Sequence, residues 1–182
     1  MSWKRAFPIA SVLAAGAVVF ALRSGSAAPA PAIALDDPTI VAIFDAANTS
    51  DIETGELGAK KGSTQAVRDF GAMLARDHKT VRQQGRDLAK KLGVTPTPPK
   101  DDNSAKDHAA IMKRLSGLSG VEFDKAFLQN EVGYHEAVIA AVTQTLLPAI
   151  QNAEFKDLVT KVAPAFVAHR DAAKNLFDKM TM

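Results

Sequence analysis

Helix-start and helix-stop signals recur from residue 35 to residue 182, and this punctuation constrains the fold more than any other feature. No stretch in this range alternates apolar and polar residues while also being enriched in β-branched side chains, which is the pattern typical of strands. The sequence therefore predicts an all-α protein. About 148 residues are enough to bury one sizeable core, so residues 35–182 are expected to form a single helical bundle domain.

Four long helices are expected, each opened by a capping side chain. The expected N-caps are Asp37, Ser63, Ser119 and Asn152, and Glu122 would complete a capping box with Ser119. The helices would run over residues 38–61, 64–92, 120–147 and 153 to about 176, with Pro164 kinking the last one. Glycine or proline follows the first two, as is usual after a helix C-terminus.

The segment between the second and third long helices is a polar, proline-rich crossover at residues 93–103. Ser104 is expected to cap a short helix that ends near Leu115. Long helices joined by short turns lie antiparallel, and one long crossover is a known variant of that arrangement. The predicted architecture is therefore an antiparallel four-helix bundle with an extra short helix in the crossover.

Residues 1–34 are expected to lie outside the bundle, as a signal peptide followed by a small-residue linker. Lys4 and Arg5 precede an uncharged apolar run at residues 8–22, and a tract of small residues follows. The run is shorter than the ~20 residues that cross a bilayer. The sequence therefore predicts cleavage and a periplasmic or secreted location, whereas an uncleaved signal would associate with the membrane.

Charge and cysteine content exclude several classes of protein. The chain has no cysteine, so the exported domain would have neither a disulfide framework nor a lipid-acceptor thiol. Acidic and basic residues are interspersed, and no basic stripe with interleaved aromatic residues appears. This argues against a nucleic-acid partner. The sequence does not identify a protein partner.

Three of the four histidines fall on the inward stripes of different long helices: His78, His135 and His169. Glu53 is expected to take the corresponding place on the first helix. Residues midway along antiparallel helices meet at one level, which is where bundles build metal sites. Three imidazoles and a carboxylate suit zinc, copper, nickel or iron. Asp77 and Glu131 are expected to orient the imidazoles by accepting hydrogen bonds from the ring nitrogens that do not bind the metal.

Other interpretations of these residues remain open. A histidine on an apolar stripe is often an ordinary core residue, and Asp77, Glu131 and Tyr134 could satisfy its hydrogen bonds. No nucleophile elbow, glycine-rich phosphate loop or His-Glu-x-x-His segment is present. The leading hypothesis is a binding or stress-related accessory protein with a transition metal. The alternatives are a metalloenzyme that uses the same histidines and a purely structural or partner-binding bundle.

Several short segments resemble a large family of exported bacterial proteins that is catalogued as a domain of unknown function and often labelled a membrane protein. They are residues 51–57, residues 67–70 followed by Asp77-His78, residues 123–127 followed by Tyr134-His135, and Ala168-His169. The resemblance covers about residues 38–178 and implies a ferritin-like bundle. It also implies that Glu53, Asp77, His78, His135 and His169 match recurring polar positions of the family.

Ferritin-like di-iron proteins place a Glu-x-x-His motif on each of two helices. Here the residues three positions before His78, His135 and His169 are Ala75, Val132 and Phe166. None of these can bind iron as the motif's glutamate does. A mononuclear, histidine-rich site is therefore the favoured metal hypothesis.

Overall fold

The computed structural model describes residues 35–181, and all of its regular structure is helical. The described range contains no strand, which confirms the predicted all-α class. No helix within it has the length and apolar character needed to cross a membrane. The expected signal peptide and linker at residues 1–34 lie outside the described residues.

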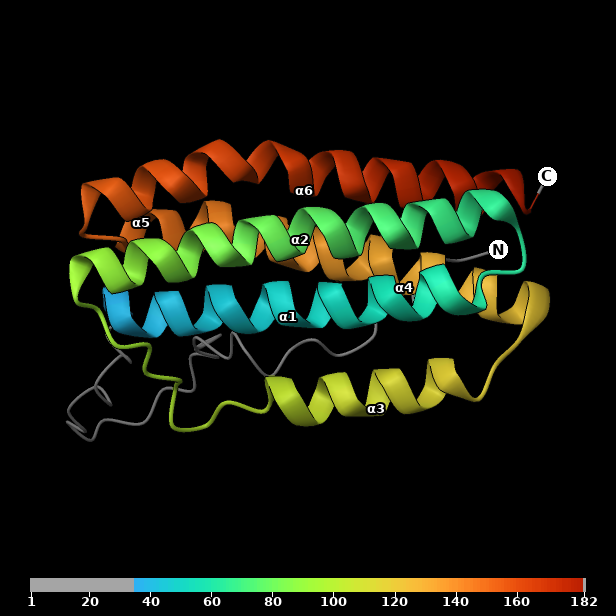
Figure 1. Ribbon diagram of the computed structural model, residues 1–182, viewed down its shortest axis with the longest axis horizontal. Coiled ribbons are helices and arrows are strands. Elements are labelled where there is room, and N and C mark those ends of the chain that lie inside the picture. Colours follow the sequence, from blue (N-terminus) through green and yellow to red (C-terminus); the bar gives the residue numbers. More distant parts are fainter. Residues whose placement is uncertain (1–34, 182) are drawn as a thin grey trace, which may run out of the picture.

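Four long helices, α1, α2, α4 and α6, lie side by side (Figure 1). The shorter α3 runs along the outside, next to α1. The bounds, in chain order, are α1 Asp37–Lys61, α2 Gln65–Leu92, α3 Ser104–Ser116, α4 Gly120–Ala141, the π-helical segment η1 Val142–Leu146, α5 Leu147–Ala149 and α6 Ala153–Lys179. The expected long helices and the short helix in the crossover are therefore present.

The bundle is built from two hairpins, α1 with α2 and α4 with α6. A tight turn at residues 62–64 joins the first pair, and η1 and α5 lead from α4 into α6. The proline-rich crossover and α3 carry the chain from one end of the bundle to the other, so α4 starts at the same end as α2 (Figure 1). The two hairpins contact each other where α2 packs against α6 and where α1 packs against α4.

Several expected caps are displaced or absent. Asp36, not Asp37, caps α1 by accepting from the Thr39 N–H at 2.9 Å. Asp37 instead accepts from the backbone N–H groups of Gln151 and Asn152, just before α6. The N-cap of α2 is Thr64 and not Ser63, and the cap position of α3 is Asn103 and not Ser104. Asn152 caps α6 as expected, through the Phe155 N–H.

Two further expectations about α4 are wrong. Ser119 occupies the N-cap position, but its side chain makes no capping hydrogen bond, so the capping box with Glu122 does not form. The α-helix also ends at Ala141, and the wider turn of η1 replaces its expected continuation to Leu147. Pro148 has no N–H to donate to the preceding turn and its ring would crowd that turn, which accounts for the widening.

Glycines allow α1 and α2 to approach closely. A Cβ atom on Gly71 would lie 2.4 Å from the backbone nitrogen of Ala59 and 2.6 Å from the carbonyl oxygen of Gly55. Both are backbone atoms, so no side-chain rotation relieves such a clash. The hairpin that carries part of the candidate site therefore depends on glycine at this position.

Gly71→Ala should lower the free energy of unfolding by about 1–3 kcal/mol, because the new methyl group overpacks the α1–α2 contact. Gly133→Ala is the matched control, since a Cβ there meets no atom within 4 Å on the exposed face of α4. The control should be neutral or stabilise by about 0.5–1 kcal/mol through helix propensity. Urea unfolding of both variants measures the difference, and equal effects would contradict the close approach.

The core has two apolar clusters separated by a polar layer. One cluster lies towards the start of α1 and includes Ile40, Phe44 and Phe155. The other includes Phe70, Phe123 and Phe127. Between them lie buried polar side chains from all four long helices: Asn48, Asp51, Thr54, His78, Glu131, His135 and His169. So many polar groups in the middle of a bundle cost stability unless they are mutually satisfied or bind a ligand.

Candidate metal centre

Three histidines from three helices meet in this polar layer. His78 comes from α2, His135 from α4 and His169 from α6, and each is at most 5% exposed. Their ring centroids are 5.1 to 5.7 Å apart. One ligand atom from each residue lies within 4.8 Å of those of the other two.

The neighbours of His78 determine which of its ring nitrogens carries the proton. Asn48 donates its side-chain N–H to the carbonyl oxygen of Phe44 at 2.8 Å, so the Asn48 Oδ1 atom is free to accept. His78 Nδ1 lies 2.9 Å from that oxygen and must therefore be the donor. In a neutral ring this leaves a lone pair on Nε2.

The same argument applies to the other two rings. His135 Nδ1 lies 2.9 Å from the carbonyl oxygen of Glu131, which can only accept, so the lone pair is on Nε2. Within the described residues this Nε2 atom is buried and has no hydrogen-bond partner. His169 Nε2 lies 3.3 Å from the carboxylate of Asp77 and donates to it, which leaves the lone pair on Nδ1.

Two of these lone pairs face each other at short range. His78 Nε2 and His169 Nδ1 are 3.2 Å apart, yet neither has a proton to donate in the neutral state. Protonating the cluster is costly, because burial, followed by the neighbouring His135 and His169, lowers the pKa of His78 to about 2. Burial is also the main reason that the pKa of His135 falls to about 4. A metal cation would satisfy these nitrogens without a proton.

A buried carboxylate lies next to the three histidines. Asp51 on α1 is 3% exposed, and its Oδ2 atom lies 3.5 Å from His78 Nε2. Its Oδ1 atom is buried without a hydrogen-bond partner in the described part of the chain. Burial, together with the charge of Glu131, raises the pKa of Asp51 well above its usual value. A nearby cation would instead favour the ionised carboxylate.

Glu131 forms a second, overlapping group with Asp51 and His135, whose ligand atoms also lie within 4.8 Å of one another. The Glu131 side chain is fully buried, and this burial raises the pKa of its carboxyl group. Its carbonyl oxygen fixes His135 at the same time. The buried His, Asp and Glu groups of the bundle could therefore hold a metal ion.

The structure brings together three of the four residues expected to bind the metal, and both residues expected to orient them contact a histidine ring. His78, His135 and His169 converge, Asp77 accepts from His169, and the backbone of Glu131 accepts from His135.

Glu53 does not join the cluster, and the expectation that it points inward is wrong. Its side chain is 50% exposed and lies 2.8 Å from His108 on α3. Successive residues of an α-helix turn by about 100°, so positions 51 and 53 face nearly opposite directions. Asp51 takes the inward place instead.

Sequence reasoning missed Asp51 and Asn48, although a signal for both was present. Ile40, Phe44, Asn48 and Asp51 follow one another at spacings of four, four and three residues, which is one face of a helix. All four are buried. Extending the apolar stripe that begins at Ile40 would have placed both polar residues in the core.

The chain belongs to the family described as Domain of unknown function (DUF4142), whose profile matches residues 22–176. Comparison with curated proteins and with solved structures finds no match.

Proposed function

We propose that this member of the DUF4142 family binds one transition-metal ion inside its bundle, through His78, His135, His169 and Asp51. One observation carries the proposal: hydrogen bonds fix the protons of all three imidazoles and leave two lone pairs, on His78 Nε2 and His169 Nδ1, facing each other at 3.2 Å. In an ordinary polar core, the second nitrogen of each imidazole would also have a hydrogen-bond donor facing it. The unpartnered Nε2 of His135 is explained in the same way.

The donor set indicates the class of metal. Three neutral imidazoles and one carboxylate suit zinc, copper, nickel or iron. Magnesium and calcium prefer ligand sets made only of oxygen atoms, so this donor set argues against them. Affinities of such sites rise towards copper(II), so copper should displace zinc when both are present. The single long crossover supports a ferritin-like bundle, but the absent Glu-x-x-His motifs favour one ion over a di-iron pair.

The proposed biological role is an exported, stress-related accessory protein that sequesters or carries the metal. Four protein ligands fill a tetrahedral site and leave no position open for a substrate, which is the pattern of non-catalytic zinc sites. A metalloenzyme is the second candidate, because a cavity reaches Asp51 and His78 and would give a substrate access to the ion. It would require one of the four ligands to leave an open position.

Equilibrium dialysis of metal-free protein against zinc, followed by elemental analysis, tests metal binding. The wild-type protein should retain about one ion per chain, as one tetrahedral set of ligands requires. His78→Ala or His169→Ala should retain far less at the same free zinc concentration. His108→Ala is the matched control, because His108 lies outside the cluster and pairs with exposed Glu53. Equal retention by all four proteins would place the ion elsewhere.

Export is tested by the mass of the chain recovered from the producing cell. If the signal at residues 1–34 is cleaved, the mature chain should begin between Ala28 and Leu35. Reversing the charge that precedes the apolar run, with Lys4→Glu and Arg5→Glu together, should block processing. Recovery of the intact wild-type chain in the membrane fraction would argue for an anchored form.

A further inference from the structure

A cavity of about 320 Å³ lies beside the candidate metal centre, between α1, α4 and the short α3. Most of its wall is apolar, and the apolar residues that line it include Ile43, Phe44, Ile111, Val138, Val142 and Phe166. Asp51 and His78 form part of its lining, so the cavity reaches the polar layer. The wall is thus contributed by helices from both hairpins and by the crossover helix.

The size of the cavity suits a small organic molecule and not just a few waters. An apolar cavity of ~150 Å³ stays dry and holds benzene, so one about twice as large accommodates two or three rings or an equivalent aliphatic chain. Ligand pockets are typically of this volume or larger and are mostly apolar with a few polar groups. The cavity meets both conditions.

The charges around the cavity indicate what kind of head group it accepts. Two carboxylates line its outer part, Asp102 next to α3 and Asp107 on α3. Among the residues that the structure describes, no lysine or arginine lines the cavity. A carboxylate or sulfonate would therefore enter without a counter-ion and beside acidic groups. An uncharged ligand avoids this cost.

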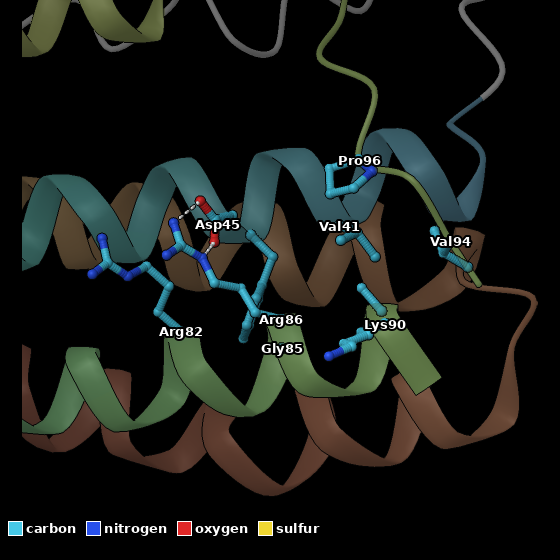
Figure 2. A pocket seen from close by; sticks show the side chains of 10 residues that line it. Val41, Asp45, Arg82, Gly85, Arg86, Lys90, Val94 and Pro96 are labelled. Carbon is cyan, nitrogen blue, oxygen red and sulfur yellow. Dashed lines mark hydrogen bonds and ion pairs between the residues drawn. The ribbon is translucent and has the colours of Figure 1, made fainter. Parts of the chain in front are cut away.

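A second cavity, of about 260 Å³, is lined by basic side chains instead of acidic ones alone (Figure 2). Arg82, Arg86 and Lys90 line it along α2, and Asp45 pairs with Arg86 through two hydrogen bonds. Anionic apolar compounds should prefer this basic cavity. We therefore expect anionic apolar probes to bind in the basic cavity and uncharged ones in the cavity between α1, α3 and α4.

We propose that the cavity between α1, α3 and α4 is a binding site for an uncharged, apolar small molecule of two or three rings or a comparable aliphatic chain. Its inner end would lie beside Asp51 and His78. The proposal goes beyond metal binding, because the volume, the apolar lining and the acidic side chains do not depend on an ion.

The test uses metal-free protein and two fluorescent probes that differ chiefly in charge, N-phenyl-1-naphthylamine and its sulfonated analogue 8-anilinonaphthalene-1-sulfonate. The uncharged probe should bind saturably, at one molecule per chain. Ala137→Phe and Ala141→Phe fill the cavity from α4 and should each weaken this binding at least about tenfold, since the volume is lost. Ala109→Phe, on the exposed face of α3, is the matched control and should bind normally.

Binding of the sulfonated probe should be weakened by Arg82→Gln with Lys90→Gln and unaffected by Ala137→Phe, because that probe belongs in the basic cavity. The proposal is overturned if the uncharged probe fails to saturate. It is also overturned if helical, folded Ala137→Phe and Ala141→Phe proteins both bind it like wild type. Because no metal is present, a negative result in the dialysis experiment leaves this test unaffected, and the reverse holds as well.

Discussion

Phe127→Ala should lower the free energy of unfolding by about 3–5 kcal/mol, as expected for removing a fully buried aromatic ring. Phe127 has no exposed surface and stacks on Phe123, with ring centroids 5.7 Å apart. Its ring also occupies the space where a Cβ of Gly58 would lie, only 2.4 Å from Phe127 Cζ. A side chain on α4 thus fits against bare backbone on α1, and alanine leaves a cavity that this rigid contact cannot close.

Urea unfolding with linear extrapolation measures this loss. Val121→Ala is the control on the same helix, because Val121 is 52% exposed, and it should change stability by less than about 0.5 kcal/mol. A loss below about 1 kcal/mol for Phe127→Ala would mean that the ring is not packed between α1 and α4.

His135→Leu should have opposite effects on metal binding and on the stability of the metal-free protein. Zinc sites in small proteins contribute about 10–16 kcal/mol over four ligands, so losing one should weaken zinc binding by on the order of 100-fold or more. Without metal, His135 is a buried residue with an unpartnered Nε2 atom. Replacing it with an apolar side chain of similar volume should stabilise the metal-free protein by about 1–2 kcal/mol.

This pair of effects separates a binding site from an ordinary polar core. If the histidines serve only to hold the core together, His135→Leu should destabilise the metal-free protein and leave its metal content unchanged. Val132→Ala is the control, because it alters a buried residue one turn away without removing a candidate ligand. It should cost stability and leave zinc affinity within about twofold of wild type.

The long helices were predictable, because caps, glycines and prolines act locally. The N-cap errors in α1 and α2 arose where two equivalent residues were adjacent. Asp36 and Asp37 are equally good caps, and only the distant N–H groups of Gln151 and Asn152 explain why Asp37 is used elsewhere. Ser63 similarly donates to buried Asp124 on α4, which leaves Thr64 to cap α2. Tertiary contacts of this kind have no local signal.

The candidate site was predictable in part, since each histidine interrupts an apolar stripe midway along a helix. What could not be inferred was the direction of each lone pair, which depends on Asn48, the Glu131 carbonyl and Asp77. Nor did the sequence indicate the apolar cavity, because it forms only where α3 is placed against α1 and α4. The inward placement of Glu53 was a local error that strict helical spacing would have corrected.

Zinc K-edge X-ray absorption on the zinc-loaded protein tests the central claim most directly, since it counts the imidazoles bound to the ion. The proposed site predicts three imidazole nitrogens and one carboxylate oxygen per zinc, with bonds of about 2.0–2.2 Å. His169→Ala should reduce the imidazole count to two if any zinc remains bound, whereas His108→Ala should leave it at three. A spectrum of the wild-type protein with only oxygen neighbours, or with a single imidazole, would contradict the account.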